Sequence, residues 1–342
     1  RINEDGKYTV EIMDTECSKV EITNISAVDS RSPELAKEIA QAQIVTTAVG
    51  LGILPRIAGA LAAGIAERKA QGVTEFLNVI ACENGLRASS QLKEHVYTHL
   101  DEAQKAYADE YVAFPDCSVD RIVPPIKSEN PIDVVVEKFY EWNVERASIK
   151  GEAAQIAGMN LADNLIAYIE RKLFTLNTGH AITAYLGKLK GHKTIADSIS
   201  DESIYAIVKA AMQESGEGLV AKYGFDHDAH FAYIDKIIGR FRNPHLQDDV
   251  TRVGREPLRK LSPNDRLIKP TLTAIEHGFA TPNLVLGIGA ALHYDNAEDP
   301  QSVQLQQAIA ENGVAKALEQ FSGISADNAL AAQILEAYDT VA

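Results

Sequence analysis

Cysteine is scarce in this sequence, and long apolar runs are absent. The three cysteines are odd in number, lie far apart and form no CxxC pair: Cys17, Cys82 and Cys117. This pattern supports neither a disulfide framework nor a cysteine zinc site, and it is typical of a reducing compartment. No apolar stretch reaches the length of a membrane span. We therefore expect a cytoplasmic protein with no membrane partner.

The sequence also lacks an excess of positive charge. Among 342 residues, 48 are Asp or Glu and 33 are Lys or Arg, which gives a net charge of -15. A charge of this sign argues against nucleic acid as a partner. The hydrophobic fraction of 46% and the charged fraction of 24% are ordinary for a globular enzyme, and the length allows two domains.

One basic cluster stands out in this acidic chain. Its members lie within one short stretch: Arg252, Arg255, Arg259, Lys260, Arg266 and Lys269. Bidentate arginine is the usual clamp for phosphate, so a subset of these residues is a candidate anion site. The alternative is that some of them pair with the acidic residues nearby, which are Asp248, Asp249, Glu256 and Asp265.

Strand patterns alternate with helix patterns in the first part of the chain. Residues 44–50 and 76–82 are apolar and rich in β-branched side chains, as buried strands are. Residues 132–142 alternate apolar and polar side chains, as a half-exposed antiparallel strand does. Later segments show a periodicity of 3.6 residues almost throughout. We predict an α/β domain with a parallel sheet over residues 1–150 and an all-α domain over residues 151–342.

Lys172, Asn177 and His180 fall within one apolar-periodic segment. At about 100° per residue on an α-helix, Asn177 lies roughly 140° and His180 roughly 80° from Lys172. All three therefore fit the side of a helix that apolar residues normally fill. Burying them is unfavourable unless each has a partner, which indicates a reactive site. The alternative is a lysine that extends to solvent, with the amide capping a neighbouring element.

Two predicted strands end in candidate ligand-binding residues. Gly50 and Gly52 follow the first strand, but Pro55 stands where a dinucleotide fingerprint needs its third glycine, so we expect only a glycine strand end beside a cofactor. Glu83 and Asn84 follow the second strand, and ligands bind at the carboxyl ends of parallel strands. Asn followed by Gly is also the commonest turn dipeptide.

Two other groups of polar residues could bind a ligand or a metal, but each also has a structural interpretation. Asp116 and the Asp120-Arg121 pair follow an extended run, where a structural salt bridge is the alternative to ligand binding. Residues 226–230 contain Asp226, His227, Asp228 and His230. This content is compatible with a metal site, but it also matches a helix N-terminus with acidic capping residues.

Taken together, these motifs resemble the polyol-specific long-chain dehydrogenase family. The resemblance rests on residues 46–50, 81–84, 119–125, 170–187, 239–244, 252–255 and 265–270, and Lys-x4-Asn-x2-His is the signature of the family. It implies a Rossmann-type first domain and covers essentially the whole chain. The family opens with a strand, a Gly-rich turn and a helix that hold the cofactor pyrophosphate, whereas Arg1 matches a point after the second strand. With this first βαβ unit missing, we expect the printed chain to bind NAD poorly and the natural protein to contain the segment.

The resemblance implies reversible hydride transfer between NAD and a sugar-alcohol phosphate, which converts D-mannitol 1-phosphate to D-fructose 6-phosphate. Lys172 would be the general base, and its pKa would have to fall from about 10.4 to about 7–8. Asn84 and Asn177 would hydrogen-bond the reacting oxygen, as an oxyanion hole does. His180 would orient the substrate hydroxyl.

The resemblance also implies the binding residues. Arg252 and Lys260 would hold the far end of the substrate, and Arg255 or Arg259 would add selectivity for phosphate. Asp120 is expected among the substrate-binding residues. The expected cofactor-binding residues are Thr47, Ala48, Val49, Gly50 and Glu83. We expect chemistry without a metal, in a monomer or a homodimer.

Three alternatives remain open at this stage. A relative that acts on a hexuronate or a free polyol would share the same signature. A lyase could use Lys172 to form a Schiff base. A cofactor-free binding protein is expected if the N-terminal segment is truly absent.

Overall fold

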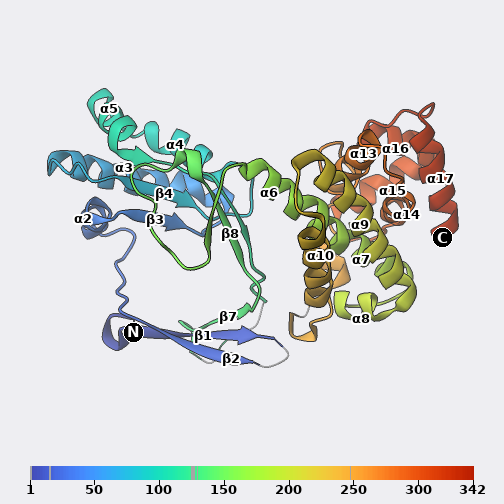
Figure 1. The fold of residues 1–342 in the computed structure, drawn as a ribbon, viewed down its shortest axis with the longest axis horizontal. Helices are drawn as coiled ribbons and strands as arrows, with labels where there is room; N and C mark the ends of the chain where they lie inside the picture. The colour runs from blue at the N-terminus through green and yellow to red at the C-terminus, as the bar shows by residue number, and fades with distance from the viewer. Residues whose placement is uncertain (1, 15–16, 125–127, 129, 247) are drawn as a thin grey trace. The chain divides into compact units, whose positions relative to one another are not determined.

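In the computed structural model, the described residues are 2–14, 17–124, 128, 130–246 and 248–342. Arg1 and Pro125, which the sequence analysis includes, lie outside these ranges. The chain forms two compact units, Arg1–Ile169 and Glu170–Ala342. The first contains both strands and helices and the second is helical (Figure 1). The predicted fold class, an α/β Rossmann-type domain followed by an all-α domain, is therefore confirmed.

The first unit contains a parallel sheet with the order β3-β4-β5. Its strands are β3 (Ile44–Thr47), β4 (Leu77–Ala81) and β5 (Val112–Ala113). The intervening helices are α3 (Leu54–Ala70), α4 (Ala88–Tyr97) and α5 (Glu102–Tyr111), and α2 (Glu34–Gln41) precedes β3. Every residue of β4 is buried. Apolar side chains of α3 and α4 pack against one face of the strand, and Ile80, on the other face, packs with Cys117 and Val144. This arrangement positions the loops that follow β3 and β4 at the carboxyl edge of the sheet.

The described part of the first unit begins with the short helix α1 (Ile2–Asp5) and contains two further three-stranded sheets. One has the order β2-β1-β7, from β1 (Lys7–Met13), β2 (Ser18–Thr23) and β7 (Val134–Glu137). The other has the order β6-β8-β9, from β6 (Cys117–Asp120), β8 (Glu141–Glu145) and β9 (Met159–Ala162).

The prediction of one antiparallel strand over residues 132–142 is wrong. The segment is divided between two sheets, since β7 pairs in parallel with β1 whereas β8 pairs antiparallel with β6. The proposed domain boundary near residue 150 also differs from the division between the units. Residues 151–169 belong to the first unit, in which β9 pairs in parallel with β8.

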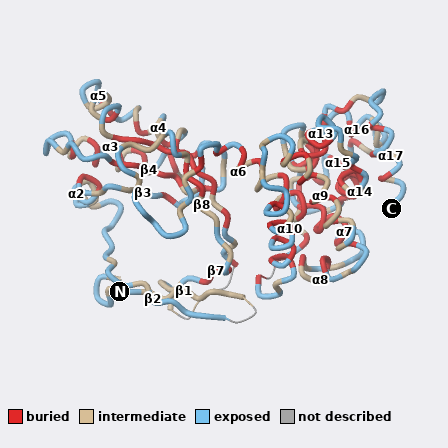
Figure 2. Tube along the Cα trace, viewed as in Figure 1, coloured by how far each residue is buried: buried red, intermediate tan, exposed pale blue. Residues whose placement is uncertain are grey.

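The second unit is built around two largely buried helices, α7 (Thr178–Leu189) and α14 (Pro282–Leu292) (Figure 2). The long helix α9 (Glu202–Tyr223) packs against α7, α13 (Ile268–Glu276) and α14. The other helices are α6 (Leu165–Arg171), which spans the boundary between the units, α8 (Ile195–Ser200), α10 (His227–Phe241), α11 (Val250–Gly254), α12 (Pro257–Lys260), α15 (Pro300–Asn312), α16 (Val314–Ser322) and α17 (Ala329–Val341). Within the described ranges, no helix combines the length and apolar content that a bilayer crossing requires.

Candidate active site

Lys172 and Asn177 are the first and last residues of a π-helical turn. This turn, η3 (Lys172–Asn177), joins α6 to α7. The expectation of a continuous α-helix is therefore wrong at this point. A π-turn contains one more residue per hydrogen-bonded ring than an α-turn. Residues five positions apart consequently lie nearer the same side of the helix than the 140° expected for Lys172 and Asn177.

Two hydroxyl groups, of Thr178 and Ser215, hydrogen-bond to backbone carbonyl oxygens of this π-turn. The Thr178 hydroxyl lies 3.1 Å from the Leu173 carbonyl oxygen and 2.6 Å from that of Arg266, and it can donate to either. Ser215 of α9 donates to the Phe174 carbonyl oxygen at 2.8 Å. These contacts fix a distortion that is frequent at functional sites.

The π-turn has a buried interior and accessible ends. Phe174, Thr175 and Leu176 are buried, whereas Lys172 and Asn177 are partly exposed. His180, on the first turn of α7, is partly exposed as well. The three signature residues, together with Leu173, therefore occupy the partly exposed positions of residues 172–180, and the other residues of this segment are buried.

Glu170, two residues before Lys172, anchors the end of α6. Its Oε2 accepts hydrogen bonds from Lys222 Nζ at 2.6 Å and from the Tyr223 hydroxyl at 2.7 Å, and its Oε1 lies 3.0 Å from Lys269 Nζ. Burial raises the pKa of Glu170, but these donors outweigh it and the net pKa is lowered. Lys269 of the basic cluster thus has a structural partner. Residue spacing alone does not indicate this network.

His180 shares a carboxylate with Arg252. The Nε2 atom of His180 lies 2.6 Å from one oxygen of Asp248, and Arg252 forms an ion pair with the other oxygen. The imidazole stacks on the Phe241 ring with centroids 5.0 Å apart. Pairing of the basic cluster with Asp248, one of the two alternatives from the sequence, is confirmed for Arg252. That Asp248 also reaches His180 was not predicted.

The surroundings keep His180 neutral. Burial is the largest cause that lowers its pKa to about 3, followed by the positive charges of Arg252, Arg240, Arg266 and Lys260. Four basic side chains thus act on one imidazole in a chain whose net charge is -15, although Lys260, with its own pKa lowered to about 7, is only partly charged near neutral pH.

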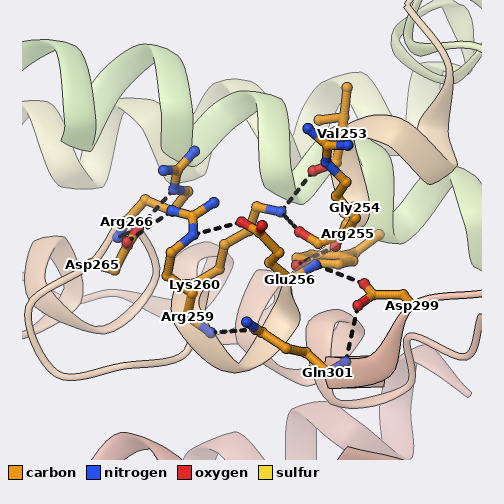
Figure 3. Close-up of polar contacts among 11 residues, drawn as sticks. Val253, Gly254, Arg255, Glu256, Arg259, Lys260, Asp265, Arg266, Asp299 and Gln301 are labelled. Atoms are coloured by element: carbon orange, nitrogen blue, oxygen red, sulfur yellow. Dashed lines mark hydrogen bonds and ion pairs between the residues drawn. The ribbon is translucent and has the colours of Figure 1, made fainter. Parts of the chain in front are cut away.

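The basic cluster contains exposed arginines and one buried lysine. Arg259 pairs with Glu256 at 2.8 Å and with Asp265 at 3.1 Å, as the sequence allowed. Arg252, Arg255 and Arg259 are nevertheless exposed. Lys260 is only 3% exposed, and its amine donates to the carbonyl oxygens of Val253, at 2.8 Å, and of Arg255 (Figure 3).

Lys260 should make the stability of the protein depend on pH. Burial, followed by the charges of Arg266 and Arg259, lowers the pKa of Lys260 to about 7. Because an unfolded lysine titrates near about 10.4, the unfolded chain binds more protons between about pH 7 and pH 10, so the folded state gains stability as pH rises through this range. Thermal unfolding of wild type, Lys260→Met and the exposed control Lys316→Met measures this gain. It should be lost only in Lys260→Met, and an equal gain in that variant would contradict the assignment.

In the first unit, Glu83 organises the loop after β3. Its carboxylate accepts hydrogen bonds from the Thr47 hydroxyl at 2.7 Å, from the Val49 N–H at 2.9 Å and from the Gly50 N–H at 2.7 Å. Burial raises the pKa of Glu83, and these three donors lower it by more. Four of the five expected cofactor-binding residues are thereby brought together, and the fifth, Ala48, lies between Thr47 and Val49.

This edge of the sheet fits a dinucleotide. Gly50 has a φ of +91°, and a side chain there would meet no other atom within 4 Å, so the backbone faces open space. Val49 and Leu51, which flank Gly50, expose apolar surface, and so does Leu86 on the loop after β4. Open backbone and apolar side chains at the carboxyl ends of parallel strands are the usual surroundings of a nucleotide cofactor.

Three other predicted residues, Asn84, Asp116 and Asp120, also belong to the first unit. Asn84 is exposed on the loop after β4, and Asp120 is buried at the end of β6. Asp116 accepts hydrogen bonds from both the backbone and the hydroxyl of Ser90, and lies 3.9 Å from Arg87. The structural alternative is therefore confirmed for Asp116.

The segment 226–230 begins a helix. Asp226 caps α10 by accepting a hydrogen bond from the Ala229 N–H at 2.8 Å, which confirms the helix N-terminus as the correct interpretation. In the part of the chain that the structure describes, no three His, Cys, Asp or Glu side chains are grouped as metal ligands would be.

A Rossmann-type unit followed by a helical unit with the Lys-x4-Asn-x2-His signature defines a class of dehydrogenases, and comparisons with known proteins identify the family. The mannitol dehydrogenase Rossmann domain matches residues 1–158, and the mannitol dehydrogenase C-terminal domain matches residues 164–342. The chain belongs to the mannitol dehydrogenase family. This membership agrees with the prediction of an oxidoreductase that uses NAD.

Two solved structures show the same fold. A D-sorbitol dehydrogenase in substrate-free form has a TM-score of 0.82 at 16% identity, covering 99% of this chain and 83% of the other. The Pseudomonas fluorescens mannitol 2-dehydrogenase, in a ternary complex with NAD and D-mannitol, has a TM-score of 0.70 at 20% identity, covering 98% and 80%. At these identities the likeness establishes the fold alone.

Proposed function

We propose that this protein is an NAD-dependent dehydrogenase that interconverts D-mannitol 1-phosphate and D-fructose 6-phosphate, a mannitol-1-phosphate 5-dehydrogenase activity. The observation that carries the proposal is the set of basic side chains around His180: Arg252 shares the Asp248 carboxylate with the imidazole, and Arg240, Arg266 and Lys260 act on the same ring. An acidic protein that concentrates positive charge beside a signature residue is suited to an anionic substrate. The phosphate supplies that charge.

The chain's own residues have distinct roles in this proposal. When bound, the cofactor would supply a hydride acceptor (NAD) for oxidation of the alcohol carbon and a hydride donor (NADH) for reduction of the ketone. Lys172 takes the proton of the reacting hydroxyl as a general base. The amide of Asn177 donates a hydrogen bond to the reacting oxygen as negative charge develops on it, and Asn84 is assigned the same role by family resemblance. Neutral His180 can accept a hydrogen bond from a substrate hydroxyl, because its pKa of about 3 keeps it unprotonated.

The proposed cofactor-binding residues are those of the loop after β3. Thr47, Ala48, Val49 and Gly50 form this loop, and Glu83 holds it through the Val49 and Gly50 N–H groups. The N–H groups of Val49 and Gly50 already donate to the Glu83 carboxylate. We therefore assign Glu83 the role of holding the shape of the loop, and not that of binding the cofactor phosphates.

The proposed substrate-binding residues are mainly arginines of the basic cluster. Arg252, Arg255 and Arg259 are exposed and carry planar donors that suit a phosphate. Lys260 adds positive charge from its buried position, and Asp120 remains assigned by family resemblance. A bound phosphate would compete with Asp248 for Arg252 and with Glu256 and Asp265 for Arg259.

The second candidate is dehydrogenation of a free polyol. The observation that favours it is the neutralisation of Arg252 by Asp248 and of Arg259 by Glu256 and Asp265. Both similar structures are also named as sorbitol or mannitol 2-dehydrogenases. A hexuronate is the third substrate to compare.

Substrate comparison tests the proposal. The enzyme as its natural host makes it is assayed with NAD and mannitol 1-phosphate, with NAD and mannitol, and with NADH and fructuronate. We expect kcat/KM for the phosphorylated polyol to exceed that for mannitol by about a hundredfold or more, since an ionic phosphate clamp contributes roughly 3 kcal/mol. Equal or greater kcat/KM with mannitol would replace the proposal by the second candidate.

A further inference from the structure

The turn between α11 and α12 is held by hydrogen bonds from three different elements. Tyr185 of α7 donates to the Gly254 carbonyl oxygen at 2.9 Å, and Lys260 of α12 donates to the Arg255 carbonyl oxygen. The Glu256 N–H donates to Asp299 at 2.7 Å. This turn, residues 254–256, joins the helix that carries Arg252 to the helix that carries Arg259, so its shape sets how the arginines are presented.

Glu256 has a backbone conformation that its sequence disfavours. Its φ is 60° and its ψ 54°, in the left-handed region, which only glycine adopts readily and which Asn and Asp tolerate better than Glu does. The next residue is Pro257, and the residue before a proline favours extended backbone. Local preference therefore opposes this conformation, and contacts from elsewhere must impose it.

Asp299 can hold Glu256 in the left-handed conformation, because it accepts a hydrogen bond from the Glu256 N–H. Its side chain is buried, and it caps α15 by accepting the Gln301 N–H at 3.0 Å through one oxygen while the other accepts the Glu256 N–H. Gln301 extends the same contact, because its side-chain oxygen accepts the Arg259 N–H at 3.0 Å. Figure 3 shows Asp299 and Gln301 beside the turn that contains Arg255 and Glu256. Residues at the start of α15 thus hydrogen-bond to the backbone at two points of the arginine-bearing segment, Glu256 and Arg259.

We propose that Asp299 is a positioning residue for substrate selection. By holding Glu256 in the left-handed conformation, it directs Arg255 and Arg259 toward the anionic end of the substrate without touching the substrate itself. This inference rests on the proposed function, which supplies the phosphate. It assigns a role to a residue 39 positions after Lys260, outside every signature motif.

The test separates substrate binding from chemistry. In Asp299→Asn, the single side-chain oxygen can still accept the Gln301 N–H and cap α15, but no second oxygen remains to accept the Glu256 N–H. We expect KM for mannitol 1-phosphate to rise about tenfold and kcat to change less than about twofold, since misplaced arginines weaken binding of the distant phosphate. KM for mannitol, which has no phosphate, should stay within about twofold of wild type.

A rescue experiment distinguishes backbone conformation from side-chain charge. Adding Glu256→Gly to Asp299→Asn should restore KM to within about threefold of wild type, because glycine adopts the left-handed conformation without the imposed contact. Adding Glu256→Ala is the matched control: it removes the same carboxylate but keeps the backbone strain, so KM should remain high. Unfolding midpoints of all variants show whether each is folded at the assay temperature.

The outcomes separate this inference from the proposed function. Equal changes in kcat and KM for both substrates, or equal rescue by glycine and alanine, overturn the positioning role. If wild type prefers mannitol, the proposed phosphate substrate is wrong. The unfolding midpoints then carry the test: a midpoint that Asp299→Asn lowers and that glycine alone restores at position 256 still supports Asp299 as the residue that positions the turn, because the left-handed conformation of Glu256 does not depend on the substrate.

Discussion

Replacing Lys172 by alanine is expected to lower kcat by about a thousandfold while changing KM by less than about threefold. Without the amine, the reacting hydroxyl has no positioned base, and general base catalysis contributes typically 10²–10⁴-fold. Binding should persist because the proposed substrate contacts lie elsewhere, on His180 and the arginines. Steady-state kinetics with mannitol 1-phosphate and NAD measure both parameters.

Two controls make the Lys172 result specific. Lys188→Ala removes an exposed lysine from α7, so it changes net charge equally and should retain full activity. Added primary amines should partly restore turnover to Lys172→Ala, because they can serve as the missing base. Activity of Lys172→Ala within tenfold of wild type would remove the base assignment. Borohydride trapping of a substrate adduct at Lys172 would favour the lyase alternative.

Much of the fold could be predicted because its signals are local. The apolar, β-branched runs of residues 44–50 and 76–82 contain β3 and β4, and the helical periodicity after residue 151 corresponds to the second unit. The pairing of residues 132–142 could not be predicted in the same way. An alternating pattern indicates one buried face, but the choice between β1 and β6 as partner depends on residues more than 100 or about 20 positions away.

The local geometry of the candidate site could not be predicted from the sequence. Spacing draws attention to Lys172, Asn177 and His180, whose roles stay a prediction, whereas the π-turn depends on hydroxyl groups of Thr178 and Ser215 that hydrogen-bond to carbonyl oxygens of the turn. Ser215 lies in a different helix, so no pattern near Lys172 reveals it. The carboxylate shared by His180 and Arg252 likewise depends on a tertiary contact with Asp248.

Arg252→Ala should have the second large effect, which combines weaker binding with a new dependence on pH. Loss of the guanidinium is expected to raise KM for mannitol 1-phosphate about thirtyfold, equivalent to about 2 kcal/mol. It also removes the second-largest cause of the low pKa of His180 and leaves Asp248, 2.6 Å from Nε2, without this cation. The pKa of His180 should therefore rise toward its ordinary value of about 6.5.

The pH profile of kcat/KM between pH 5 and pH 8 tests this second effect. In wild type, His180 with a pKa of about 3 stays neutral throughout the range and contributes no acidic limb. In Arg252→Ala, protonation of His180 as pH falls removes the acceptor that orients the substrate hydroxyl, so kcat/KM should fall toward pH 5. Arg255→Ala is the matched control: it should raise KM without the acidic limb, because Arg255 is not one of the four cations that act on His180. Adding Asp248→Asn to Arg252→Ala should abolish the limb, since no carboxylate then favours the imidazolium. A profile of Arg252→Ala that parallels wild type would show that Arg252 and Asp248 do not control the charge of His180.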